Sequence, residues 1–410
     1  MGRLKKILIV GSGYAGACAA RMLTDLGHEV HVFEKGSVPG GMARSFYIDG
    51  MTYEFGPHII ANHHCTDKTI QFIKKYVDVE DTFLATASFL QGHYLNYPPV
   101  VDDIQYLKER EKIEKELGSL NGHQADEKSF ETYLISKVGK TLYQLFYESF
   151  TEKFWQVKPA TLDASWAKLR RLGENLYERK MFFNRSWCTY PKKDFNELFD
   201  NILKGIDVKY RMEIRDIDLD RGVLIDSDGN KFFGDVIIST LSIDRLLNFK
   251  YGELDYSGYT IEPVVIEKEY YHPADPMTGR RYSMVYYPEK EVKHCRITEY
   301  KSFNHKADHP AYRGRTVITI ETPSRKARFY PFVDSKNEDK FRKYIEEFSL
   351  RSNIIPLGRM GLYKYTTIDT ATEQIFRLMD AIGPNFRTWE HMTPSVRTDA
   401  YYTIRGSWNN

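Results

Sequence analysis

One stretch decides the fold of this 410-residue chain: Lys6-Ile7-Leu8-Ile9-Val10-Gly11-Ser12-Gly13-Tyr14-Ala15-Gly16. Its first five residues are the short apolar run that a buried parallel strand requires. A helical pattern follows through Leu23, and Gly27 closes it. Glu29–Phe33 is predicted to be a second strand that ends at Glu34. The order strand, glycine turn, helix and strand predicts a dinucleotide-binding βαβ unit.

Each glycine of this stretch has a physical task. Gly11 allows the tight turn, Gly13 lets a pyrophosphate approach the backbone, and Gly16 lets the helix pack closely on the strand. The pyrophosphate then lies at the positive end of the helix, and Glu34 accepts hydrogen bonds from an adenosine ribose. The predicted cofactor-binding residues of this unit are Gly11, Gly13, Tyr14, Ala15, Gly16, Glu34 and Lys35.

A second glycine loop favours FAD over NAD as the cofactor. Gly40-Gly41 follows Glu34 closely, which lets a second loop close over the pyrophosphate and reach toward a flavin. Two later segments agree with this interpretation: Asp235–Thr240 as a strand that returns to the same sheet, and Gly358-Arg359 ahead of a helix at Ala371–Leu378. These loops add Gly41, Met42, Ala43 and Arg359 to the predicted cofactor-binding residues.

The composition is typical of a globular protein in a reducing compartment. Hydrophobic residues make up 42% and charged residues 28%, and the net charge is only +2, which argues against a nucleic-acid or membrane-surface partner. No apolar run reaches the roughly 18 residues of a membrane helix. Four widely spaced cysteines without a CxxC pair, and an N-terminus without a signal-peptide pattern, predict a cytoplasmic location and neither a disulfide framework nor a metal site.

The rest of the chain divides by its periodicity. Helical patterns such as Phe130–Val138 and Leu142–Phe150 occur within residues 67–185. Short alternating runs predict antiparallel strands at Thr260–Lys268, Tyr282–Tyr287, His294–Tyr300 and Arg315–Glu321. The predicted fold class is α/β: a discontinuous, Rossmann-like FAD-binding domain with a helical domain and an antiparallel β-sheet domain. The FAD-binding domain is assigned residues 1–75, 186–250 and 345–410, the helical substrate domain 76–185, and the sheet domain 251–344.

Several side chains outside the glycine loops are candidates for chemistry. His58 follows the second glycine loop and is able to tune a flavin by hydrogen bonding, with a structural loop histidine as the alternative. Trp155 is expected to stack on a sugar or base, or to belong to the core. Arg296 on a predicted strand is suited to clamp a diphosphate, although surface arginines are common. Tyr330 and Tyr365 are further candidates. Hydrolytic, metal-dependent and ATP-driven schemes lack support, because no nucleophile elbow, HExxH or P-loop motif occurs.

Taken together, these residues resemble the UDP-galactopyranose mutase family, flavoenzymes that interconvert the pyranose and furanose forms of a nucleotide sugar. The resemblance runs from the N-terminus to about residue 378. The GxGxxG motif is shared with many flavoproteins. Other segments are more specific: Gly56-Pro57-His58-Ile59, Thr151-Glu152-Lys153-Phe154-Trp155, Ser242-Ile243-Asp244, Arg296-Ile297-Thr298-Glu299-Tyr300-Lys301, Phe329-Tyr330-Pro331 and Tyr363-Lys364-Tyr365.

The resemblance implies an isomerase with its active site between the three domains. In such an enzyme FAD must be reduced although the reaction has no net redox change: flavin N5 attacks the anomeric carbon, the nucleoside diphosphate leaves, and the sugar ring opens and recloses through a different hydroxyl. The implied partners are a nucleotide-sugar substrate (UDP-galactose or a related UDP- or dTDP-sugar) and a cellular reductant for the flavin. The sequence does not decide whether the protein forms a homodimer, and no nucleic acid, membrane or metal partner is expected.

By the same resemblance, each candidate residue receives a role. Arg296, Tyr330 and Tyr365 grip the diphosphate and His58 orients the flavin, so these four are the predicted catalytic residues. Trp155 borders the sugar, and two phenylalanines sandwich the base. The predicted substrate-binding residues are Phe146, Phe150, Thr151, Trp155, Arg170, Arg171 and Trp187.

Some positions depart from the family pattern. The family's second diphosphate arginine aligns with Gly173, so either Arg170 or Arg171 is expected to take its role, or the loop differs. Lys192-Lys193-Asp194 replaces a glycine pair, Tyr286-Tyr287 replaces an asparagine-containing strand near the sugar, and the tail beyond residue 380 is additional. The resemblance therefore does not determine which sugar and which base the substrate carries. Two other functions also stay open: an FAD-dependent amine oxidase or desaturase, which needs no diphosphate clamp, and a non-catalytic flavoprotein that serves as a binding module.

Overall fold

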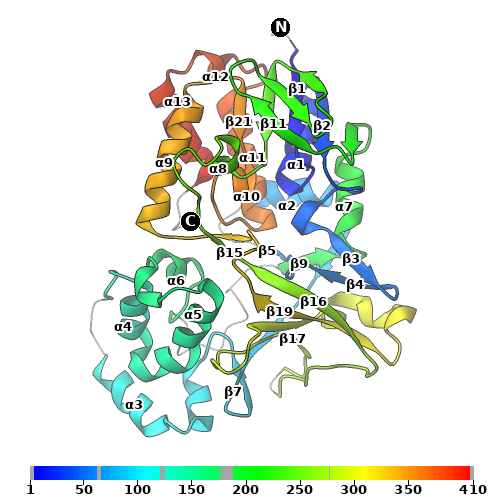
Figure 1. The fold of residues 1–410 in the computed structure, drawn as a ribbon. Coiled ribbons are helices and arrows are strands. Elements are labelled where there is room, and N and C mark those ends of the chain that lie inside the picture. Colours follow the sequence, from blue (N-terminus) through cyan, green and yellow to red (C-terminus); the bar gives the residue numbers. More distant parts are fainter. Residues whose placement is uncertain are drawn as a thin grey trace.

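The molecule consists of two lobes joined at a narrow waist (Figure 1). This computed structural model describes residues 4–61, 66–120, 125–174, 176, 188–276 and 278–406. The upper lobe holds the N-terminal βαβ unit, drawn in blue, and the C-terminal helices, drawn in orange and red. The lower lobe holds a group of helices beside a large sheet.

A five-stranded parallel sheet forms the centre of the upper lobe. Ile9 lies in register between Val32 and Ile238 of its two neighbouring strands, and all three side chains are buried. Because the strands come from the start, middle and end of the chain, the predicted discontinuous Rossmann-like domain and the returning strand near residues 235–240 are confirmed. In sheet order the strands are β10 (Asp207–Tyr210), β2 (Glu29–Glu34), β1 (Lys6–Val10), β14 (Val236–Ser239) and β21 (Ile354–Pro356).

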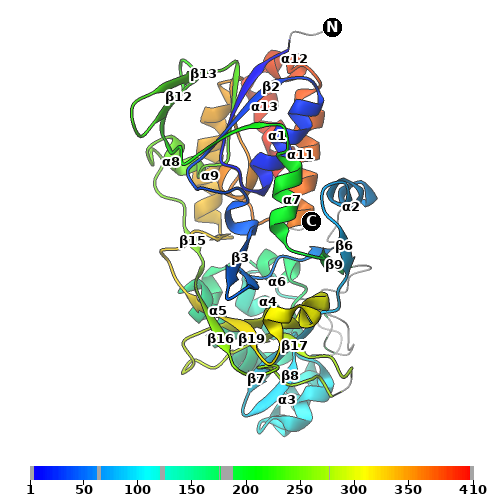
Figure 2. The same ribbon diagram turned by 90° about the vertical axis from the view of Figure 1, so that its right-hand side faces the viewer.

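Helices pack around this sheet, and those after residue 380 belong to the same core. Trp389 is buried against Tyr401, with ring centroids 5.1 Å apart. Arg405 forms an ion pair with Glu338 and donates to the Tyr363 carbonyl at 3.1 Å. The additional tail is thus an integral part of the upper lobe, as Figure 2 shows from the side. The helices are α1 (Tyr14–Asp25), α2 (Asp67–Lys74), α7 (Phe195–Ile202), α8 (Ile243–Leu246), α9 (Ser335–Ser349), α10 (Gly358–Gly361), α11 (Ile368–Ile382), α12 (Arg387–His391) and α13 (Pro394–Arg405).

The sheet of the lower lobe has six strands and is mixed. The four strands predicted between residues 260 and 321 are confirmed. The prediction was wrong for residues 85–96, which were assigned to the helical domain but add two strands to this sheet, one of them parallel to its neighbour. In sheet order the strands are β16 (Tyr259–Ile266), β19 (Thr316–Pro323), β18 (Arg296–Glu299), β17 (Tyr282–Tyr286), β7 (Ala85–Leu90) and β8 (His93–Asn96).

The composition of residues 85–88 explains why the strand that contains them was not predicted. The segment Ala85-Thr86-Ala87-Ser88 carries small side chains and lacks the bulky β-branched pattern from which a strand is inferred.

The predicted end of the sheet domain at residue 344 was also wrong, because α9 begins at Ser335 and packs against α13 in the upper lobe. Asp334 caps this helix by accepting a hydrogen bond from the Asn337 N–H at 2.7 Å, which marks its start.

The helical part of the lower lobe confirms both predicted helical runs. Ser129 caps its main helix by accepting a hydrogen bond from the Thr132 N–H at 3.1 Å. A π-helical stretch at Gln144–Glu148 then leads into the next helix, a local widening that often occurs at functional sites. The helices are α3 (Arg110–Ser119), α4 (Phe130–Tyr143), α5 (Ser149–Trp155) and α6 (Ser165–Leu169).

Short strand pairs lie at the waist between the lobes in both views (Figures 1 and 2). Two of these pairings join segments that are far apart in the sequence: residues 60–61 with 188–189, and residues 256–257 with 330–331. These strands are β3 (Ser45–Ile48) with β4 (Met51–Glu54), β5 (Ile60–Ala61) and β6 (Val79–Asp81) on either side of β9 (Cys188–Pro191), and β15 (Tyr256–Ser257) with β20 (Tyr330–Pro331). A separate three-stranded sheet on the upper lobe comprises β11 (Ile214–Asp218), β12 (Val223–Asp226) and β13 (Lys231–Phe233).

Candidate active site

The N-terminal end of α1 opens onto a cavity of about 680 Å³. Gly13 is the N-cap of this helix and has no side chain to cap it, so the positive end of the helix is available to an anion. Eight of the predicted cofactor-binding residues line the cavity: Gly13, Tyr14, Ala15, Gly16, Met42, Ala43, His58 and Arg359.

The glycines of this cavity fit a dinucleotide. A Cβ atom on Gly13 would meet nothing within 4 Å, so this backbone faces open space. A Cβ atom on Gly16 would lie 2.0 Å from the Gly11 carbonyl oxygen, and one on Gly11 2.2 Å from Thr240 Oγ1. Two glycines thus permit close packing and one leaves room for a ligand, as a pyrophosphate cradle requires. We name Gly11–Gly16 with Gly40–Ala43 and Gly358 the cofactor cradle.

Glu34 lies at the end of β2, beside the first glycine loop. Its Oε2 accepts hydrogen bonds from Ser12 N–H and Ser12 Oγ, both at 2.8 Å, and its Oε1 accepts one from the Gly36 N–H at 2.7 Å. These bonds fix the carboxylate at the rim of the cradle and leave it lone pairs for further donors. Ribose binding by Glu34 stays a prediction. Lys35 is exposed beside it, and Gly41 adopts a positive φ of 55°.

A larger cleft adjoins the cofactor cradle. It encloses about 1290 Å³ including its open mouth, and both lobes contribute to its walls. Met42, His58, Arg359, Thr367 and Ile368 line both spaces, so the cradle and the cleft form one continuous site. We name the larger space the substrate cleft.

Arg296 enters the substrate cleft from the sheet, where β18 holds it beside Glu321 of β19. Its Nε and Nη2 donate to the two carboxylate oxygens of Glu321 at 3.0 and 2.5 Å, and Nη1 donates to the Tyr286 hydroxyl at 3.2 Å. Thr298 Oγ1 donates to the same carboxylate at 2.7 Å. Because Glu321 is fully buried, it fixes the plane of the guanidinium and neutralises part of its charge.

Tyr330, Tyr365 and Arg359 form a stack that also lines the substrate cleft. The two tyrosine rings are 5.4 Å apart at an interplanar angle of 23°, and the Arg359 guanidinium lies 4.9 Å from the Tyr365 ring centroid. Arg359 Nη1 donates to the Phe329 carbonyl at 3.0 Å. Burial, reinforced by Tyr365, raises the pKa of Tyr330 to about 12, so its hydroxyl remains a donor at neutral pH.

The helical wall of the cleft carries most of the predicted substrate-binding residues. Phe146, Phe150, Thr151 and Trp155 line it, whereas Trp187 lies outside the described residues. Trp155 is buried and meets Trp166 edge-on, with ring centroids 5.1 Å apart. Its Nε1 has no hydrogen-bond partner within the described part of the chain. A buried donor without a partner is costly, so this N–H is available to a ligand.

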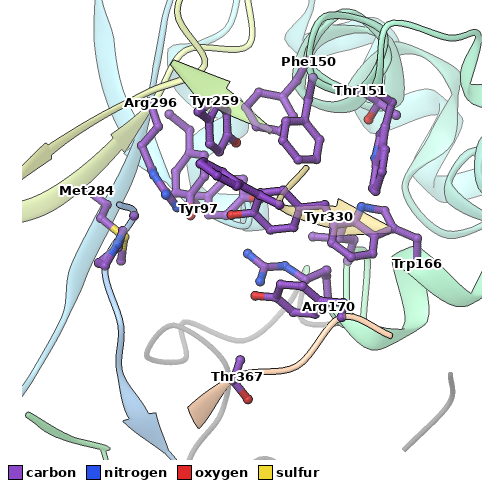
Figure 3. A pocket seen from close by; sticks show the side chains of 18 of the residues that line it. Tyr97, Phe150, Thr151, Trp166, Arg170, Tyr259, Met284, Arg296, Tyr330 and Thr367 are labelled. Atoms are coloured by element: carbon purple, nitrogen blue, oxygen red, sulfur yellow. Dashed lines mark hydrogen bonds between the residues drawn. The ribbon is translucent and has the colours of Figure 1, made fainter. Parts of the chain in front are cut away.

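Arg170 and Arg171 differ in where they point. Arg170 lines the cleft and approaches it from α6, while Arg296 approaches from the sheet, with Tyr330 near the middle (Figure 3). Arg171 is half-buried, adopts a positive φ of 49°, and does not line the cleft. Of the two arginines that the sequence analysis left open, Arg170 is the one in the cleft.

Lys153 of the Thr-Glu-Lys-Phe-Trp segment has a structural task. Its Nζ donates to four backbone carbonyls, and burial lowers its pKa. These bonds hold the loop after β17 against α5, so this part of the segment shapes the helical wall and does not face a ligand. The four carbonyls belong to Tyr287 at 2.6 Å, Glu289 at 3.0 Å, Val292 at 2.8 Å and His294 at 3.0 Å.

Other residues of the cleft were missed by the sequence analysis. Tyr97 stacks on Tyr286 with ring centroids 3.8 Å apart, next to Phe150. Tyr97 precedes Pro98 in a segment without a motif, so only the Tyr-Pro turn signal marked it. Trp166, Tyr259 and Met284 also line the cleft and were missed, because their elements show only burial or helix periodicity in sequence. Glu321, which holds Arg296 from behind the wall, was missed as well.

Metal and membrane sites find no support in the described ranges. Among these residues no group of three or more His, Cys, Asp or Glu side chains is placed to hold a metal ion. Within the same ranges no helix has the length and apolar character needed to cross a bilayer.

Comparison with known proteins agrees with this geometry. The family model of UDP-galactopyranose mutase matches residues 145–365, and that of an NAD(P)-binding Rossmann-like domain matches residues 9–76. A probable UDP-galactopyranose mutase from Klebsiella pneumoniae is 23% identical over 95% of this chain and 97% of its own. A dTDP-fucopyranose mutase from Escherichia coli is 23% identical over 90% and 96%. A crystal structure of reduced UDP-galactopyranose mutase superimposes with a TM-score of 0.76 at 19% identity, covering 96% of this chain and 99% of that one.

The matched segment from residue 145 to 365 is more than half of the chain and contains the predicted catalytic residues Arg296, Tyr330 and Tyr365. His58 lies in the N-terminal part, between the cofactor cradle and the substrate cleft. The chain therefore belongs to the UDP-galactopyranose mutase family, a family of isomerases.

Proposed function

We propose that this protein is an FAD-dependent mutase that interconverts the pyranose and furanose forms of a nucleotide sugar, either UDP-galactose or a related UDP- or dTDP-sugar. One observation carries the proposal. A dinucleotide cradle continues into a cleft whose walls present Arg170, Arg296 and Arg359 together with two tyrosines. Such a set suits a substrate that carries a diphosphate.

The residues of the chain would divide the work of binding. Gly11–Gly16 and the second glycine loop would hold FAD, and bound reduced FAD would supply the nucleophile for the anomeric carbon. Arg170 and Arg296 would hold the diphosphate from opposite walls, with the Tyr330 and Tyr365 hydroxyls as further donors. Retention of the diphosphate matters, because its escape would leave the sugar open to hydrolysis.

The sugar and the base would lie on the helical wall. The free Nε1–H of Trp155 would donate to a sugar hydroxyl, with Thr151 beside it. Phe146 and Phe150 would flank the base. Tyr286 with Tyr97 adds two stacked rings to this region, which supports a preference for substrates with an apolar ring face.

An FAD-dependent amine oxidase or desaturase is the weaker alternative. Its neutral or cationic substrate would meet the positive charge of Arg359, which forms no ion pair within the described part of the chain and donates to the Phe329 and Thr366 carbonyls. Charge repulsion or desolvation would then oppose binding.

The decisive experiment compares oxidised and dithionite-reduced protein. FAD-loaded protein is incubated with UDP-galactose, UDP-N-acetylgalactosamine and dTDP-fucose, and the products are resolved by chromatography. Isomerisation by the reduced form alone is the expected result. Net oxidation of substrate with release of hydrogen peroxide would instead support the oxidase, and a colourless protein that takes up no FAD would overturn both functions.

A further inference from the structure

A buried carboxylate lies directly behind His58. Glu54, at the end of β4, is fully buried. Its Oε2 accepts a hydrogen bond from the His58 N–H at 2.8 Å and lies 3.2 Å from His58 Nδ1. Its Oε1 accepts a hydrogen bond from the Tyr190 hydroxyl. The four-residue spacing of Glu54 and His58 places both on one turn at the waist between the lobes.

A buried lysine stands behind the tyrosine. Lys306 Nζ lies 3.2 Å from the Tyr190 hydroxyl oxygen and 2.7 Å from Thr52 Oγ1. Burial lowers the pKa of Lys306 to about 8, and the negative charges of Glu54 and Asp194 oppose that decrease. At neutral pH the lysine therefore remains an ammonium group and partly balances the Glu54 carboxylate.

The proton positions in the chain of contacts Lys306, Tyr190, Glu54 and His58 follow from which of these groups are able to donate and which only accept. An ammonium group only donates, so the Tyr190 oxygen accepts from Lys306 and its own proton goes to Glu54. A carboxylate only accepts, so the proton between Glu54 and His58 resides on Nδ1. In a neutral imidazole the other nitrogen, Nε2, is then without a proton. Phe195 packs edge-on against the imidazole at 5.8 Å between centroids and restrains the ring.

We propose that Glu54 is a positioning residue that holds His58 with Nδ1 protonated and presents Nε2 as a hydrogen-bond acceptor at the junction of the cofactor cradle and the substrate cleft. The inference rests on the proposed function, in which FAD occupies the cradle. His58 lines both spaces while its Nδ1 faces the buried carboxylate, so the opposite edge of the ring is the one available to a ligand. Carboxylate-oriented histidines are used in this way to fix one tautomer.

The tautomer decides which group His58 is able to bind. An unprotonated Nε2 accepts a hydrogen bond from an N–H or O–H group of the cofactor or substrate, whereas the opposite tautomer would present a donor. Glu54 thereby determines which ligand group His58 is able to bind, although Glu54 itself does not contact the ligand. Sequence reasoning assigned His58 to the flavin but gave no role to Glu54, Tyr190 or Lys306.

The test reads the tautomer directly from the full-length protein. The protein is labelled with ¹⁵N in its histidines, and the imidazole shifts of His58 are assigned by comparison with a His58→Gln spectrum. Spectra are recorded with and without FAD at about pH 7.5, where an ordinary imidazole is mostly neutral and Lys306 is still mostly an ammonium group. We expect the Nδ1–H form of His58 in both states. We expect Glu54→Gln to shift His58 toward the Nε2–H form, which free histidine favours, because glutamine offers a single acceptor oxygen and adds a competing donor.

Tyr312→Phe is the matched control. It removes a buried hydroxyl from the same region, one that accepts a hydrogen bond from the Thr52 N–H at 2.9 Å and, within the described ranges, forms no hydrogen bond with Glu54 or His58. The control should leave the His58 tautomer unchanged. A wild-type spectrum with the Nε2–H form would overturn the proposal even if Glu54→Gln does not fold. A wild-type Nδ1–H form that persists in Glu54→Gln would overturn the role of Glu54.

A second readout uses the loaded enzyme. Glu54→Gln should change the midpoint potential of bound FAD and lower kcat about tenfold while KM for the nucleotide sugar stays nearly constant. Glu54→Asp, which keeps the carboxylate, should recover part of both. If no nucleotide sugar is isomerised but the tautomer responds to Glu54→Gln, the proposed function fails and the pairing of Glu54 with His58 stands.

Discussion

The cofactor cradle and the substrate cleft are neighbours, but they are built from different material. The cradle consists mainly of backbone: three glycines at the start of α1 determine its shape, and a helix end supplies its charge. The cleft consists of side chains from the sheet, the helical part and the waist. Its charged groups depend on partners that are distant in the sequence, as Arg296 depends on Glu321.

This difference shows how each region tolerates change. In the cradle, the effect of one added methyl group on folding depends on the free space beside the Cα atom that carries it. In the cleft the loss of one side chain leaves its buried partner without compensation, so damage to stability and damage to binding arise together. Four predictions test this contrast, from the largest expected effect to the smallest.

The largest effect is expected in the cradle. Gly16→Val would place a Cβ atom only 2.0 Å from the Gly11 carbonyl oxygen, a steric clash that should cost more than about 4 kcal/mol or prevent folding. Gly13→Ala is the control, because its Cβ atom meets open space: the protein should fold with a loss of about 1 kcal/mol at most but bind FAD more weakly. Thermal unfolding and FAD titration measure the two effects. A stable, yellow Gly16→Val protein would contradict the prediction.

The second prediction concerns the paired charges of the cleft. Arg296→Ala should lower the free energy of unfolding by about 3–5 kcal/mol, because it leaves the buried Glu321 carboxylate unpaired. The double variant Arg296→Ala/Glu321→Ala should regain most of this stability while nucleotide-sugar turnover stays low. Urea unfolding and turnover assays separate the two losses. Equal stability of the single variant and the wild type would show that the ion pair is not the main support of this wall.

The third prediction concerns pH and the buried Lys306. Its pKa is lowered from 10.5 to about 8 in the folded protein, so between these values the unfolded chain binds more protons than the folded one. The contribution of Lys306 to the free energy of unfolding should therefore rise with pH across this window, by up to about 3 kcal/mol. Urea unfolding of wild type and Lys306→Met from pH 7.5 to 10.5 measures the difference. A difference that stays constant with pH would argue against a depressed pKa.

The smallest effect distinguishes two neighbouring arginines. Arg170→Ala should weaken UDP binding by about 2 kcal/mol, roughly thirtyfold in Kd, because a charge-assisted contact to the diphosphate would be lost. Arg171→Ala should have little effect, because Arg171 does not line the cleft. Isothermal titration calorimetry on both variants decides the matter, and the opposite order would move the second diphosphate contact to Arg171.

Sequence reasoning was strongest where function is local. The strand, glycine loop and helix from Lys6 to Leu23 carry their own periodicity and turn residues, and the structure confirms each element. The later strands near Arg296 were also found, because their residues alternate. The small residues at 85–88 concealed a strand, since β structure there depends on neighbouring strands more than on local preference.

The partners of the site residues were beyond reach for a related reason. Glu321 pairs with Arg296 across 25 positions, and Lys306 approaches Tyr190 across 116. Nothing in one sequence relates such positions until strands β18 and β19 are paired and the waist is assembled. The resemblance to the mutase family supplied the roles of Arg296, Tyr330 and Tyr365, but it could not indicate which buried groups support them.

The edge-on pair of Trp155 and Trp166 places two tryptophan fluorophores inside the cleft. Both indoles line the space that a ligand would fill, and Trp166 also lies 5.8 Å from the Tyr365 ring. Entry of a polar diphosphate would change the surroundings of two fluorophores at once, whereas Trp389, enclosed against Tyr401 in the upper lobe, would emit as a steady background. Ligand occupancy should therefore be visible in the intrinsic fluorescence of the unlabelled protein.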